Sequence, residues 1–157
     1  METTFLESQF LTNQKLVKLI FKTTFVAFVV GAIFGLIQDS SMFEIFTTFF
    51  LFTLALYVSF SKIGMKTKVD TTTLYIKHPF VGNMKVILSE IVSVEKTNFK
   101  FPPNRKSYHK KFGTLYRMYG NNGLLIKMKN KNSVYLGSQK VENLEDAIQS
   151  KLNKKMD

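Results

Sequence analysis

The chain has 157 residues, of which 22 are lysine or arginine and 11 are aspartate or glutamate, so its formal net charge is +11. It contains no cysteine, which excludes disulfide bonds, thiolate nucleophiles and cysteine-based zinc sites. The charges are distributed unevenly: residues 23–60 contain no lysine or arginine, and Asp39 and Glu44 are their only acids. The composition therefore divides the chain into an apolar N-terminal part and a basic remainder.

Two apolar segments in the N-terminal part predict a pair of membrane-spanning helices. Residues 23–37 alone are too few, because a span takes about 20 apolar residues. The segment becomes long enough when its helix begins near residue 16 and the lysines at 18 and 22 extend toward the interface. The second segment covers residues 42–60, after a polar break. Because backbone groups in hydrocarbon must be satisfied internally, we predict helices at about 16–37 and 42–60.

Two alternatives to this interpretation fit the sequence poorly. A secretory signal peptide is disfavoured because Glu2 and Glu7 precede the basic residues and no small-x-small cleavage site follows. A buried hairpin of a soluble protein would need a large partner to cover 38 residues that carry two charges.

The lysines that flank the apolar segments predict the orientation of the hairpin. The turn at residues 38–41 contains Asp39 and no cation, whereas lysines lie before the first segment and after the second. These flanking lysines are Lys15, Lys18, Lys22, Lys62, Lys66 and Lys68. We therefore expect a multi-pass protein of the cell membrane with both termini in the cytoplasm.

Small residues form a stripe along the first predicted helix. Ala27, Gly31 and Gly35 recur every fourth residue, which places them on one face where another helix can approach closely. The stripe either receives the second helix of the same hairpin or forms an interface with a second chain, and the first interpretation is the simpler one.

From residue 61 onward, short alternating runs separated by turn residues predict β-strands. About seven strands are expected, mostly antiparallel, at residues 65–69, 73–78, 84–88, 91–97, 114–119, 124–129 and 133–137. Gly and Asn residues at 120–123 and 130–132 are typical of hairpin turns. In the C-terminal segment, Val141, Leu144, Ile148 and Leu152 fall on one face of an amphipathic helix. The fold class is therefore a transmembrane helical hairpin followed by a mostly-β domain that a C-terminal helix closes.

No catalytic or metal-binding pattern is found in the sequence. His78 and His109 are too far apart to form a metal-ligand pair, and His78, before Pro79, is expected in a turn role. Glu90 and Glu95 are the only acids between Asp70 and Glu142, and an odd spacing on a strand directs them to opposite faces. We expect no enzymatic activity, no metal and no cofactor.

The most basic stretch lies between the fourth and fifth predicted strands. Its cations are Lys96, Lys100, Arg105, Lys106, Lys110, Lys111 and Arg117, with no acid among them. Interleaved aromatics are Phe99, Phe101, Tyr108 and Phe112, which could dip into a membrane interface. The alternation of Phe99 and Phe101 also fits the end of a strand whose aromatics lie in the core. Contact with anionic lipid headgroups or with a partner is the favoured interpretation, because a membrane anchor would already hold the loop near the surface. A plain solvated loop is the next interpretation, and nucleic acid is not expected as a partner.

A resemblance to a known group rests on this layout and on two segments, LSEIVSVE at residues 88–95 and VYLGSQ at residues 134–139. Together they resemble the pleckstrin-homology-like (PH-like) domains of bacteria, which are often tethered behind membrane helices. The resemblance assigns residues 1–61 to a membrane anchor and residues 62–157 to a cytoplasmic PH-like domain. A short apolar front before such a domain is similar to the immunity proteins of the sublancin type, which protect a bacteriocin producer from its own peptide. The resemblance thus implies self-immunity, with an antimicrobial peptide or a membrane protein as partner; an accessory subunit or lipid-surface adaptor of a membrane transporter or enzyme is the alternative.

Overall fold

A computed structural model describes residues 4–38, 40–99, 108–118 and 120–153. The chain forms two compact units, one of which is Phe10–Ile63 and consists mainly of helices. The other unit joins Gly64–Asp157 to the N-terminal residues up to Gln9. This division differs in one respect from the boundary expected at residue 61, because the N-terminal segment belongs to the strand-rich unit and not to the anchor.

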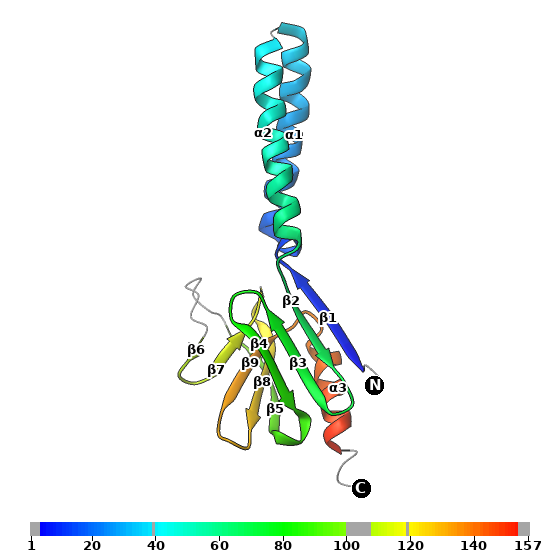
Figure 1. The fold of residues 1–157 in the computed structure, drawn as a ribbon, viewed down its shortest axis with the longest axis vertical. Helices are drawn as coiled ribbons and strands as arrows, with labels where there is room; N and C mark the ends of the chain where they lie inside the picture. Colours follow the sequence, from blue (N-terminus) through cyan, green and yellow to red (C-terminus); the bar gives the residue numbers. More distant parts are fainter. Residues whose placement is uncertain (1–3, 39, 100–107, 119, 154–157) are drawn as a thin grey trace. The chain divides into compact units, whose positions relative to one another are not determined.

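The helical unit is an antiparallel pair of long apolar helices (Figure 1). A short 3₁₀ helix, η1 (Leu11–Asn13), precedes α1 (Lys15–Gln38), and α2 (Ser40–Ser61) follows. Both helices are long and apolar enough to cross a membrane, and almost none of their surface is buried within the chain. Aromatic rings join them: Phe28 stacks on Phe50 with ring centroids 4.3 Å apart, and Phe21 lies 4.2 Å from Tyr57.

Several hydroxyl groups in these helices are bonded to the helix backbone, whereas the buried Thr47 hydroxyl of α2 has no hydrogen-bond partner among the described residues. Thr24, Thr53 and Ser59 each donate a hydrogen bond of 2.9 Å to the carbonyl oxygen four residues earlier. Such bonds satisfy a hydroxyl in surroundings that offer no water, which suits a helix exposed to hydrocarbon.

The second unit contains two sheets and one helix. One sheet has the order β1-β2-β3-β4, and the other has the order β5-β8-β9-β7-β6. The strands of the first sheet are β1 (Phe5–Phe10), β2 (Gly64–Val69), β3 (Thr73–His78) and β4 (Gly82–Ile87). After η2 (Leu88–Glu90), the second sheet is built from β5 (Ile91–Asn98), β6 (Tyr108–His109), β7 (Gly113–Tyr116), β8 (Asn122–Met128) and β9 (Ser133–Gly137). The C-terminal helix is α3 (Val141–Asn153).

The described strands number nine where about seven were expected, since β1 and β6 were not predicted. Most neighbours pair antiparallel as expected, but β7 and β9 run parallel, with Thr114 opposite Val134 and Tyr116 opposite Leu136. The antiparallel β2–β3 and β3–β4 pairs are hairpins with short connections.

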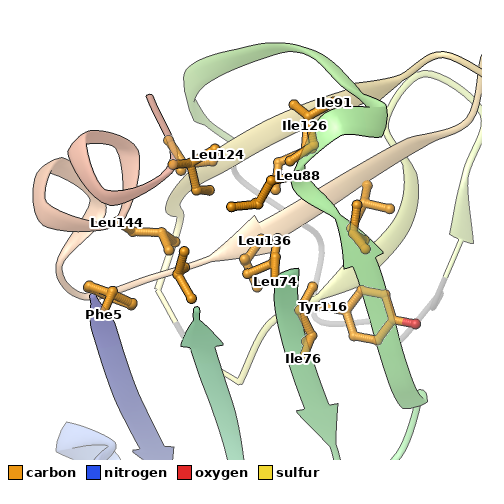
Figure 2. Packing of buried hydrophobic residues seen from close by; sticks show 14 of the residues in the cluster. Phe5, Leu74, Ile76, Leu88, Ile91, Tyr116, Leu124, Ile126, Leu136 and Leu144 are labelled. Carbon is orange, nitrogen blue, oxygen red and sulfur yellow. The ribbon is translucent and has the colours of Figure 1, made fainter. Parts of the chain in front are cut away.

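One hydrophobic core joins both sheets to α3. Figure 2 shows Leu74 and Ile76 from the first sheet gathered with Leu124 and Leu136 from the second, and Leu144 of α3 completes the cluster. All five side chains are almost entirely buried. The amphipathic face predicted for the C-terminal helix therefore covers the core.

Strand β1 is held in place by polar side chains that point inward. The Glu7 carboxylate is buried and accepts hydrogen bonds from the Ser138 hydroxyl (2.6 Å) and the Gln139 backbone N–H (2.8 Å), just before α3. The Gln9 side chain is also buried and donates to the Gly137 carbonyl oxygen (2.9 Å). At the other end of the strand, the Thr4 N–H donates to the Val69 carbonyl oxygen (2.9 Å). These bonds tie the N-terminal strand to the start of α3.

We predict that Glu7→Ala lowers the free energy of unfolding by about 1–3 kcal/mol, because it removes the acceptor of the buried Ser138 hydroxyl and of the Gln139 backbone N–H. Urea unfolding of the full-length protein in detergent, followed by the near-ultraviolet circular dichroism of its tyrosines, measures the change. Ser8→Ala, at the exposed neighbouring position, is the matched control and should have little effect. Equal stability of Glu7→Ala and Ser8→Ala would contradict the role given to Glu7.

Candidate functional site

The seven cations of the predicted basic surface do not form one described surface. Lys100, Arg105 and Lys106 lie outside the described residues. The remaining four occupy three different environments. Lys96 pairs with the C-terminal helix, Arg117 lies in the loop after β7, and Lys110 and Lys111 line a cleft.

Lys96 forms an ion pair with the C-terminal helix. Its Nζ lies 2.9 Å from Oε2 of Glu145. The hydrogen bond to Glu145 raises the pKa of Lys96, and the nearby charges of Glu142 and Asp146 act in the same direction. Because the lysine is exposed to solvent, the pair adds little stability. Its charge is nevertheless balanced by the acids at the start of α3, so Lys96 contributes little to an anion-binding surface.

Arg117 closes the loop after β7. Its Nη1 donates a hydrogen bond to the Gly120 carbonyl oxygen (3.2 Å). Burial lowers the pKa of its guanidinium from the ordinary value. Its backbone carbonyl accepts a hydrogen bond of 2.8 Å from Nε2 of His78. Arg117 therefore has a structural position between the two sheets.

Lys110 and Lys111 are exposed on the turn between β6 and β7, where they line a cleft of about 260 Å³. Lys131, on the turn between β8 and β9, lines the same cleft. Polar groups of Tyr108, Thr114, Asn132 and Ser133 and the apolar side chains of Met84, Met128 and Val134 complete the lining. No acidic side chain lines this cleft in the part of the chain that the structure describes.

The parallel pairing of β7 with β9 explains why these two turns meet. Thr114 lies opposite Val134, so the first residues of the two strands are neighbours in the sheet. The turns that precede them are therefore brought to the same end of the sheet. Gly113 is required at this point: it has a positive φ of 69°, and a Cβ there would collide with the Ser133 carbonyl oxygen. Lys131 was not among the predicted site residues, because a parallel pair leaves no local signal in the sequence.

The aromatic residues of the basic stretch are divided between the core and the surface. Phe112 is only 6% exposed and forms a second, smaller hydrophobic cluster with Leu115, Leu125 and Tyr135. Phe99 is partly buried and packs against this second cluster. Burial of the Phe112 ring contradicts the expectation that it enters a membrane interface. Phe99 follows the alternative of a core aromatic at a strand end, with its ring centroid 4.4 Å from that of Phe112. Tyr108 is 63% exposed. Phe101 lies outside the described residues.

The small-residue stripe of α1 faces two directions. Gly31 and Gly35 are buried against α2, where a Cβ at Gly31 would lie 2.6 Å from the Phe46 ring and one at Gly35 would lie 2.7 Å from the Phe43 backbone nitrogen. Ala27 is exposed and lines an apolar groove of about 690 Å³ together with Val30 and Gly31. The two glycines thus serve the close approach of the hairpin's own helices.

The described residues contain no group of three or more His, Asp or Glu side chains placed to hold a metal ion. What the cleft offers is positive charge and hydrogen-bond donors, which suit the binding of an anion. No family model, no curated protein and no solved structure matches the chain.

His78 joins the first sheet to the second. It is buried; its Nε2 faces the Arg117 carbonyl oxygen, and its Nδ1 accepts hydrogen bonds from the backbone N–H groups of Phe80 and Val81, both at 3.1 Å. Two donors pointing at Nδ1 fix the neutral form with its proton on Nε2. Burial lowers the pKa of His78, and the hydrogen bond to Arg117 opposes this effect only in part.

We predict that the free energy of unfolding falls as the pH is lowered from 7 to 5. The folded-state pKa of His78 lies below the unfolded value of 6.5, so the unfolded chain binds the proton first. The contribution is complete above pH 6.5 and is lost as the pH falls toward the folded pKa, by at most about 1.4 kcal/mol per pH unit. His78→Asn should flatten this dependence in urea unfolding. A slope equal to that of the unmodified protein would contradict the prediction.

Proposed function

We propose that this chain is a membrane-anchored, non-enzymatic binding protein whose strand-rich unit is a cytoplasmic PH-like domain. The observation that carries the proposal is the position of the apolar hairpin, which is inserted between two neighbouring strands, β1 and β2. A binding unit interrupted in this way is attached to its anchor through two short connections.

The pairing of β1 with β2 supports the proposed topology. Hydrogen-bonded strands cannot lie on opposite sides of a bilayer, so the chain that leaves β1 must return to the same side before it enters β2. Two membrane-spanning helices return the chain to the side on which it started, whereas a single one leaves it on the opposite side. The lysines that flank the hairpin and the lack of a cation in its turn favour the cytoplasm for both termini.

The PH-like assignment is supported by the two sheets of mainly antiparallel strands around one core that a C-terminal helix covers. The two segments that carry the resemblance fall on regular elements: residues 88–95 form η2 and the start of β5, and residues 134–139 include most of β9 and the connection to α3. The strands β1 and β6 are additions to the expected seven, and the parallel pairing of β7 with β9 departs from the mostly antiparallel layout.

From the resemblance we propose self-immunity against a bacteriocin of the sublancin type, by occlusion or sequestration of the membrane target of the peptide. The apolar groove beside Ala27 favours a second candidate, an accessory subunit or lipid-surface adaptor of a membrane transporter or enzyme, since a helix of a partner would cover it. Co-purification of a stoichiometric membrane partner in mild detergent would favour that second function.

The topology is tested by single-cysteine labelling, which is clean because the chain contains no cysteine. Ser41→Cys, at the turn of the hairpin, should react with a membrane-impermeant maleimide in intact bacterial cells. Ser150→Cys, at an exposed position of α3, should react only after the membrane is opened. Reaction of Ser150→Cys in intact cells would contradict the proposed orientation.

The immunity function is tested by expression in a sensitive bacterium that is challenged with a panel of membrane-targeting peptides, a sublancin-type glycopeptide included. We expect protection against one peptide, seen as a raised inhibitory concentration relative to cells with an empty vector. Protection against none of them would contradict immunity while leaving the labelling result unaffected.

A further inference from the structure

We infer that the cleft between the β6–β7 and β8–β9 turns is a binding site for a small anion that carries a phosphate group. The inference does not depend on the immunity function, because it rests on the lining of the cleft alone. Three lysines from two separate turns, Lys110, Lys111 and Lys131, line a cavity of about 260 Å³. The Nζ of Lys111 also lies over the Phe112 ring, 5.5 Å from its centroid.

The balance of charge around the cleft favours an anion. Among the described residues, no ion pair engages any of these three lysines. Glu95 is the acid nearest in sequence to Lys110 and Lys111, and Glu142 is the acid nearest to Lys131. Neither lines the cleft, and Glu95 is paired with Lys127 at 2.6 Å. Cations brought together without a counter-charge repel one another, so an anion in the cleft is favoured by all three.

The hydrogen-bonding groups favour phosphate over a carboxylate. Lysine ammonium groups can only donate, and the hydroxyl groups of Tyr108, Thr114 and Ser133 add further donors from the cleft wall. A phosphate group has a charge of about −1.5 to −2 and three strong acceptor oxygens, which match several donors at once. The cavity is somewhat smaller than the roughly 300–1,000 Å³ of pockets for drug-sized ligands, so it suits a small phosphate ester.

The backbone at Lys131 gives an independent reason to regard this lysine as functional. Lys131 has a positive φ of 63° and ends a tight turn in which its N–H donates to the Met128 carbonyl oxygen (3.0 Å). Glycine or asparagine is favoured in this conformation, yet the two asparagines of the turn, Asn130 and Asn132, lie on either side of it. A lysine with positive φ lowers the stability of the fold. Its presence at this position is explained if its positive charge attracts an anion bound in the cleft.

The same turn provides a matched pair of variants. Lys131→Asn removes a charge that lines the cleft and places a residue that tolerates positive φ, so it should raise the melting temperature. Lys129→Asn removes the same charge two residues away, at an exposed side chain that does not line the cleft. The pair therefore separates the effect of the cleft from that of net charge.

Two arms of one experiment test the site and identify the source of the phosphate. In the first, full-length protein in maltoside micelles, which contain no phosphorus, is titrated with glycerol 3-phosphate while amide resonances of residues 110–114 and 131–134 are followed by NMR. In the second, the protein is placed in nanodiscs of phosphatidylcholine with or without phosphatidylglycerol. Shifts in the first arm support a soluble phosphate ester, and shifts confined to the second support a lipid headgroup.

We expect Lys131→Asn to weaken binding by about fivefold, the effect of one lysine near an anionic group, and Lys129→Asn to leave it nearly unchanged. Because Lys131→Asn should be the more stable protein, its loss of binding cannot be attributed to unfolding. The inference is overturned by a lack of shifts in both arms, or by equal weakening in the two variants, which would mean that only overall charge matters. Neither result depends on the orientation of the hairpin.

Discussion

The pairing of β1 with β2 is the constraint on which the rest of the molecule depends. The hydrogen bond from Thr4 to Val69 and the contacts of Glu7 and Gln9 with residues 137–139 hold the N-terminal strand in the sheet-rich unit. The apolar hairpin must therefore begin and end at the same edge of that unit. Both connections between the two units are only a few residues long.

The role of each basic residue in the strand-rich unit depends on the groups that surround it in the fold. Lys96 is compensated by α3, and Arg117 is used in a loop that His78 joins to the first sheet. Where the parallel β7–β9 pair brings two turns together, Lys110, Lys111 and Lys131 line one cleft, and the described residues that line it include no acid. A uniform basic stretch in the sequence is thus divided into structural and binding positions by strand pairing.

The sequence predicts those elements whose pattern lies within a short stretch of the chain. The two long apolar runs and the apolar residues from Val141 to Leu152, spaced by three or four, correctly predicted the three α-helices, since such periodicity is set within each element. Strand β1 was missed because Glu7 and Gln9, which face the core, are polar while the exposed Leu6 is apolar, so the usual alternation is reversed. The cleft was half predicted: Lys110 and Lys111 were named, but Lys131 joins them through a pairing between distant residues that no local pattern encodes.

The insertion of the hairpin between β1 and β2 also has a consequence for biogenesis. Strand β1 leaves the ribosome before both apolar helices, yet its partners in β2 and its hydrogen-bond partners at residues 137–139 are synthesised only after them. With the helices across a membrane, β1 remains unpaired until the second of them has returned the chain to the original side. A hairpin inserted with only one span would leave β1 and its core-facing Phe5 separated from the remaining strands. In the proposed topology, therefore, only a chain with both helices inserted could close the core of the β unit.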